Sequence, residues 1–150
     1  MIATTVALAT PPSGQHTTPP VTGTLQPVDS EPGGVEFETR TPMEVTTSTL
    51  TLDPGGFTGW HIHPGVLIAT VQAGTVVGEV AGESRTYSVG ESFVVHGDEP
   101  TGQVRNPSVA QPASVSVTQI APAGTPRRTA SDPPRCTASG ARGASRHRGR

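Results

Sequence analysis

The chain has 150 residues, a length that suits one domain, and no stretch approaches the roughly 18 consecutive apolar residues of a membrane-spanning helix. The only cysteine is Cys136, which excludes an intramolecular disulfide and a cysteine-based zinc site. All ten basic residues are arginine, and seven of them lie in residues 122–150, so a basic tail follows an acidic body.

The N-terminal segment has features of a secretory signal. It begins MIATTVALATPPSG, a short apolar run with the small-x-small triplet Ala7-Leu8-Ala9, which suits cleavage after Ala9. No Arg or Lys precedes Arg40, so the positive start of such a signal is missing, and secretion and a cytoplasmic location both stay open. Six prolines between residues 10 and 34 oppose regular structure, so residues 1–33 are expected to be a disordered leader.

From Gly34 onward the sequence has the pattern of strands. VEFETR alternates apolar and charged residues, MEVTTSTLTL is rich in β-branched residues, and DPGG at 53–56 predicts a turn. Further short runs follow, each bounded by Gly, Pro, Asn or Asp: VLIATVQA, TVVGEV, RTYSV, ESFVV and ASVSVTQI. The spacing predicts an antiparallel sandwich or barrel over residues 34–124. Its expected core residues are Val45, Leu50, Leu52, Val71, Phe93 and Val95.

The tail, residues 125–150, contains RCTASGARGASRHRGR, which has no apolar periodicity and no aromatic residue to stack on a base. The sequence therefore predicts a solvated, disordered tail and no nucleic-acid partner.

GWHIHPG, residues 59–65, places two histidines one residue apart. On a strand, positions i and i+2 point to the same side, so His61 and His63 reach into the same space. Two imidazoles inside a barrel suit a divalent transition metal with open coordination positions. A pair of polar side chains that bind only water is the alternative.

The spacing around these histidines resembles the first motif of the cupin family: Gly55, five residues, His61, Ile62, His63, and Gly74 eleven positions later. Gly90 and Asn106 resemble parts of the second motif, with Asn106 displaced by one position. DPGGFTGWHIHPG is similar to a group of small, apparently exported bacterial cupins that carry GWHxHPG. The resemblance implies an all-β fold, the cupin-type double-stranded β-helix (jelly-roll barrel), with His61 and His63 as metal ligands.

The sequence departs from the family pattern at two ligand positions. Leu67 stands where the first motif has glutamate, although the GWHxHPG group also tends to lack it, and Thr101 or Gly102 stands in place of the second-motif histidine. Substitute pocket residues are His96 and Gln103, with the loop residues Asp98 and Glu99 also within reach. Trp60 alternates with the histidines and is expected to face away from the lumen.

Together these patterns predict a small cupin-domain protein that binds a small molecule, a divalent transition metal (Zn, Fe, Mn, Ni or Cu), or both, through a reduced His-x-His site. A metal-dependent oxygenase or isomerase is one alternative, and a non-catalytic structural cupin without metal is another. No membrane span is expected, and a homodimer through sheet edges stays open.

Overall fold

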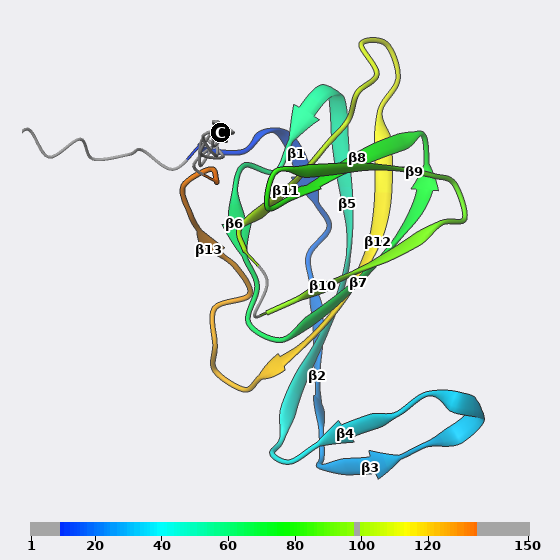
Figure 1. The fold of residues 1–150 in the computed structure, drawn as a ribbon, viewed down its shortest axis with the longest axis vertical. Coiled ribbons are helices and arrows are strands. Elements are labelled where there is room, and N and C mark those ends of the chain that lie inside the picture. The colour runs from blue at the N-terminus through cyan, green and yellow to red at the C-terminus, as the bar shows by residue number, and fades with distance from the viewer. Residues whose placement is uncertain (1–9, 98–99, 135–150) are drawn as a thin grey trace, which may run out of the picture.

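A computed structural model describes residues 10–97 and 100–134 of the chain, which are almost entirely β-structure (Figure 1). Within them no helix is long and apolar enough to cross a membrane. The only helical element of the described part is one turn of 3-10 helix, η1 (Pro32–Gly34). The strands are β1 (Ser13–Thr17), β2 (Val21–Leu25), β3 (Val28–Ser30), β4 (Phe37–Thr39), β5 (Met43–Phe57), β6 (His61–Ile62), β7 (Val66–Ala73), β8 (Thr75–Val80), β9 (Glu83–Ser88), β10 (Ser92–His96), β11 (Gly102–Arg105), β12 (Ala113–Pro122) and β13 (Thr129–Ala130).

The strands form a nearly closed antiparallel barrel. One side has the order β10-β7-β12-β5, and the other has β9-β8-β11-β6-β13. The long strand β5 joins the two sides, because it pairs with β12 along most of its length and with β11 at Phe57. The predicted all-β jelly-roll barrel is therefore confirmed.

The core lies between the two sides and is aliphatic. Its largest fully buried side chains are Leu52, Val71, Val76 and Val115. Of the residues expected in the core, Leu52 and Val71 are buried, and Leu50, Phe93 and Val95 pack against them. The prediction that Val45 belongs to the core was wrong. Alternate residues of a strand face opposite sides, and the even-numbered residues Thr46, Leu50 and Leu52 are the ones that face inward on β5.

The DPGG segment was expected to form a turn between strands, but it lies inside β5. The strand bulges there: Gln15 of β1 pairs with Leu52 and Ser13 pairs with Phe57, so a few residues of β1 oppose a longer stretch of β5. A bulge bends and twists the strand that carries it. β5 can therefore pass from one side of the barrel to the other without a break.

The prediction of a disordered leader was wrong for residues 13–30, because they contain the strands β1, β2 and β3. β1 and β2 both pair antiparallel with β5, and β3 pairs with β4 in a separate hairpin. The prolines do not prevent this pairing, since Pro19 and Pro20 lie between β1 and β2 and not within them. The pairing covers an edge of β5 that would otherwise present unpaired backbone groups to solvent.

The prediction of a disordered tail was also wrong for the first residues of the tail, because β13 pairs with β6. The proposed cleavage after Ala9 and residues 135–150, including Cys136, lie outside the described residues.

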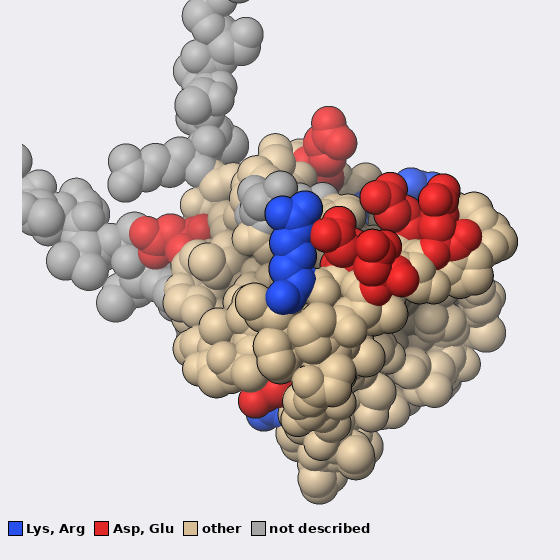
Figure 2. Space-filling view, turned by 90° about the horizontal axis from the view of Figure 1, so that it is seen from below, with Lys and Arg blue, Asp and Glu red and all other residues tan. Residues whose placement is uncertain are grey.

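The acidic body predicted from the charge distribution is visible at one end of the molecule. Acidic side chains gather on the face seen from below in Figure 2. The β3–β4 hairpin carries Asp29, Glu31, Glu36 and Glu38, and Arg40 follows it.

Candidate metal centre and barrel lumen

Two glycines place the histidine motif against the rest of the barrel. Gly59 has φ 68° and Gly65 has φ 102°, backbone conformations that other residues rarely adopt. A Cβ atom at Gly59 would collide with the carbonyl oxygen of Thr10, and one at Gly65 with that of Ile120. Both positions therefore need glycine, because Gly59 lies against the backbone of residues 10–12 and Gly65 against the backbone of β12.

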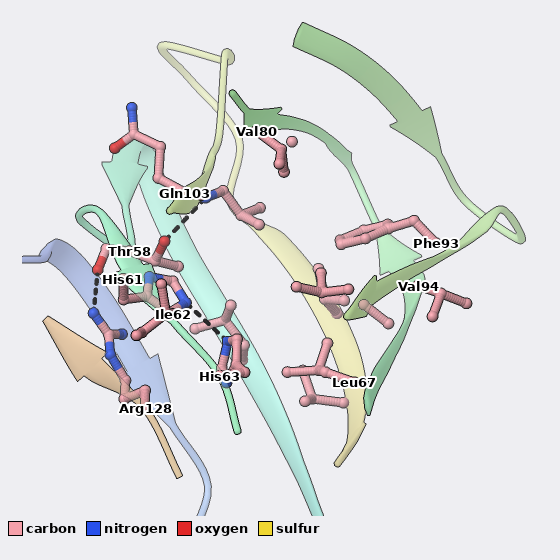
Figure 3. A pocket seen from close by; sticks show the side chains of 18 of the residues that line it. Thr58, His61, Ile62, His63, Leu67, Val80, Phe93, Val94, Gln103 and Arg128 are labelled. Atoms are coloured by element: carbon pink, nitrogen blue, oxygen red, sulfur yellow. Dashed lines mark hydrogen bonds between the residues drawn. The ribbon is translucent and has the colours of Figure 1, made fainter. Parts of the chain in front are cut away.

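The two imidazole rings meet edge to face inside the barrel (Figure 3). Their centroids are 4.7 Å apart, the ring planes are 82° apart, and the two Nε2 atoms are separated by 2.9 Å. Each Nδ1 atom lies against a backbone carbonyl oxygen: His61 Nδ1 is 2.7 Å from Gly59 O, and His63 Nδ1 is 2.8 Å from Arg127 O. The expectation that both side chains point to the same space is met.

The carbonyl contacts determine which nitrogen of each ring carries the proton. A carbonyl oxygen only accepts, so the Nδ1 atom of each histidine must be the donor. In neutral rings both Nε2 atoms then carry lone pairs, and these lone pairs face each other at 2.9 Å. With both protons on Nδ1, the contact is favourable only when a cation, either a shared proton or a metal ion, lies between the two nitrogens.

Protons bind poorly to this pair. Burial lowers the pKa of His61 from 6.5 to about 4, against the opposing effect of the hydrogen bond to Gly59, and the positive charge of Arg128 adds to the lowering. The pKa of His63 is lowered as well, first by burial and also by Arg128. Both rings are therefore neutral at pH 7 and available as ligands.

We expect the metal-free protein to lose stability as the pH falls from about 6.5 to about 4. In this window His61 of the unfolded chain binds a proton that the folded chain excludes, so the unfolded state is favoured at lower pH. The lowered pKa of His63 acts in the same direction. Urea unfolding in the presence of a chelator, at pH 7.0, 5.5 and 4.5, measures the loss.

The matched control for this prediction is the double variant His61→Gln, His63→Gln, which has no titrating ring at the site. Its stability should fall less steeply over the same pH range. Equal slopes for the parent and the double variant would show that the histidines are not the cause.

The histidines line a cavity of about 870 Å³, which is large enough for a small molecule. Apolar side chains of β5, β7, β10 and β12 cover much of it, among them Leu50, Leu67, Phe93, Val95, Val115 and Val117. Of the charged side chains that line it within the described residues, Arg85, Arg127 and Arg128 are basic and Glu83 is acidic.

The other predicted pocket residues have different surroundings. His96, at the end of β10, lines the same cavity and stays a predicted pocket residue. Gln103 also lines it, but its Nε2 donates to Glu79 Oε2 at 2.6 Å, and its amide points away from the histidines in Figure 3. Asp98 and Glu99 lie outside the described residues. Trp60 lines a separate hollow with Phe57 and Pro107, in agreement with the expected outward direction.

Gln119 is a site residue that was not predicted from the sequence. It lies on β12 opposite Leu67 of β7, is only 5% exposed, and lines the cavity. Its position could have been found, because Gln119 continues the inward-facing row of Ala113, Val115 and Val117 and is its one polar member. A buried amide thus stands beside the position where the cupin motif has glutamate.

Arg127 and Arg128 were also missed, since they belong to a tail with no strand pattern. The Arg127 carbonyl lies against His63, and Arg128 donates from a guanidinium NH2 group to Thr58 O at 2.7 Å (Figure 3).

Comparison with solved structures finds similar barrels. Oxalate oxidase in complex with the substrate analogue glycolate is 25% identical, with a TM-score of 0.44, over 49% of this chain and 40% of that chain. A cupin domain from Bordetella pertussis is 25% identical, with a TM-score of 0.43, over 51% and 80% of the two chains. The Cupin_2 domain of an XRE family transcriptional regulator from Enterobacter cloacae is 20% identical, with a TM-score of 0.44, over 68% and 95%.

These neighbours include cupin domains, and the strand order of this chain likewise gives a nearly closed antiparallel barrel. The chain spans about two fifths of the length of the oxalate oxidase that it matches. No family model and no curated protein matches the sequence.

The residues of this barrel fit a metal ion through two imidazole nitrogens. His61 and His63 would hold the ion through their Nε2 atoms, which are close enough, at 2.9 Å, to contact one ion together. Both rings are oriented by a hydrogen bond from the other nitrogen, as metal-binding histidines usually are. Among the described residues no group of three or more His, Cys, Asp and Glu side chains converges, so the described part of the chain offers these two imidazoles without a third such side chain beside them.

Proposed function

We propose that this cupin-type barrel binds a divalent transition metal through His61 and His63, together with a small molecule in its lumen. The observation that supports the metal most strongly is the pair of Nε2 lone pairs, 2.9 Å apart, on rings whose Nδ1 atoms are committed to carbonyl oxygens. Imidazole suits Zn, Cu, Fe and Ni, and Mn accepts it together with oxygen ligands.

The charges of the site favour an anionic ligand with an apolar body. Two neutral imidazoles leave the full charge of the metal uncompensated, and Arg128 adds a further positive charge close to both rings. Arginines outnumber acids on the described cavity wall, while the rest of that wall is largely apolar. A carboxylate or a similar anion would complete the coordination and offset this charge.

A bound metal would supply Lewis-acid or redox chemistry to such a ligand. An oxygenase or isomerase is the alternative from the enzyme class. We favour binding, because no third histidine or carboxylate of the described residues joins His61 and His63.

Untagged protein, stripped with a chelator, is expected to bind one equivalent of Zn(II), Ni(II) or Cu(II) in a calorimetric titration at pH 7.5. The double variant His61→Ala, His63→Ala should show no such binding, because both nitrogen ligands are removed. Elemental analysis of the protein before stripping identifies the metal acquired during expression.

The control is His16→Ala, which removes an exposed histidine that contacts Asp53 on the outside of the barrel. It should bind metal as the parent does. Equal binding by the double variant and the parent would show that His61 and His63 are not ligands, and no binding by the parent would favour the structural cupin.

A further inference from the structure

The C-terminal segment, residues 125–131, is attached along the histidine strand. Thr129 pairs with Ile62 and Ala130 with His61, and Ser131 N donates to Trp60 O at 3.0 Å. The guanidinium of Arg128 holds the same segment to Thr58, the residue before Gly59. The segment therefore follows β6 residue by residue, although sequence patterns indicated a free tail.

The Arg127 carbonyl lies where this segment crosses the end of the motif, and it accepts two hydrogen bonds. One comes from His63 Nδ1 at 2.8 Å and the other from Gln119 Nε2 at 2.8 Å. Gln119 is 5% exposed and faces inward from β12, on the opposite side of the barrel in strand order. One carbonyl oxygen therefore connects β12, the C-terminal segment and the ring of His63.

This connection determines which nitrogen of His63 carries the proton and how its ring is oriented. With the Arg127 carbonyl in place, the proton of the neutral ring stays on Nδ1 and the lone pair on Nε2 faces His61. If the carbonyl moved away, the ring could rotate or carry its proton on Nε2, and His63 would no longer offer an Nε2 lone pair beside that of His61. His61 has no such dependence, because its acceptor, Gly59 O, belongs to its own strand segment.

We propose that Gln119 is a positioning residue of the metal site, which acts by holding the Arg127 carbonyl of the C-terminal segment against Nδ1 of His63. This inference rests on the proposed metal-binding function, whereas the hydrogen bonds to the Arg127 carbonyl do not depend on a metal. Gln119 works through the C-terminal segment, so the site is complete only when that segment is attached.

The test is Gln119→Met, an apolar change of similar length, with Gln119→Leu as a second variant, both in the full chain. Metal affinity for Zn(II), measured by calorimetry, is expected to fall about 10- to 100-fold, the usual effect of removing a residue that orients a metal ligand. Without metal, ¹⁵N-edited NMR of the imidazoles should show His63 leaving the Nδ1-protonated form while His61 keeps it. Trypsin should also cleave after Arg127 and Arg128 faster than in the parent.

Gln72→Leu is the control, because it removes an amide of the same size from an exposed position of β7 that does not line the cavity. It should leave the affinity, the ring state and the tryptic rate unchanged. Thermal unfolding shows whether each variant is folded at the temperature of measurement.

The outcomes separate this inference from the proposed function. If the parent binds Zn(II) and both Gln119 variants bind it equally well, the positioning role is refuted and the metal site stands. If the parent binds no metal, the proposed function and the role in a metal site fall together. In that case, a change in which nitrogen of His63 carries the proton in the Gln119 variants would still support the contact through which Gln119 positions the ring. An unchanged His63 would refute that contact too.

Discussion

Replacing Asn106 by aspartate is expected to lower the free energy of unfolding by at least about 3–5 kcal/mol at pH 7, the range for leaving a buried charge without its partner. Asn106 is 2% exposed, and its Nδ2 donates to the carbonyl oxygens of Leu52, Asp53 and Gln111 at 3.2, 3.1 and 2.8 Å. Aspartate has the same shape but no donor when ionised, so a carboxylate oxygen would face three carbonyl oxygens. The bulged part of β5 and the loop before β12 would both lose their attachment.

Urea unfolding at pH 7 and at pH 4.5 measures this effect. The loss should be smaller at the lower pH, where the aspartate can take up a proton and regain one donor. The control is Gln72→Glu, the same chemical change at an exposed position of β7, which should alter stability by no more than about 0.5 kcal/mol. An Asn106→Asp protein as stable as the parent would mean that this hydrogen-bond network does not hold the barrel together.

Deletion of residues 1–26 is expected to lower the midpoint of thermal unfolding by more than about 15 °C, which corresponds to a loss of several kcal/mol for a domain of this size. β1 and β2 together pair with β5 from Met43 to Phe57, so the deletion exposes one edge of the longest strand and the side chains beneath it. It also removes Thr10, whose backbone packs on Gly59 beside the histidine motif. Circular dichroism during heating measures the shift.

A single substitution tests the same pairing without shortening the chain. Gly23→Pro removes a backbone donor from β2 opposite Val45 and should reproduce part of the loss. Val21→Ala, at a side chain that is 72% exposed on the same strand, should have little effect. If the deletion leaves the midpoint unchanged, β1 and β2 are not part of the stable barrel.

The sequence by itself determined the features that depend on neighbouring residues. The two-residue alternation of β12 and the β-branched composition of β5 predicted strands, and turn residues at short intervals predicted an antiparallel barrel. The spacing of His61 and His63 predicted a shared direction, because that direction follows from backbone geometry over three residues. The glycines beside them were visible as part of the motif, although the contacts that require them were not.

Only the tertiary structure decided which distant segments complete the barrel and its site. Proline content suggested a free leader, but the exposed edge of β5 provides a partner for β1 and β2, and a pattern within the leader cannot show that edge. His63 is held by a backbone carbonyl group. Every residue has such a group, so the type of residue could not reveal this contact. Gln119 and Arg127 meet His63 only after β12 and the C-terminal segment are placed against β6, because strand registry depends on packing across the barrel rather than on local preference.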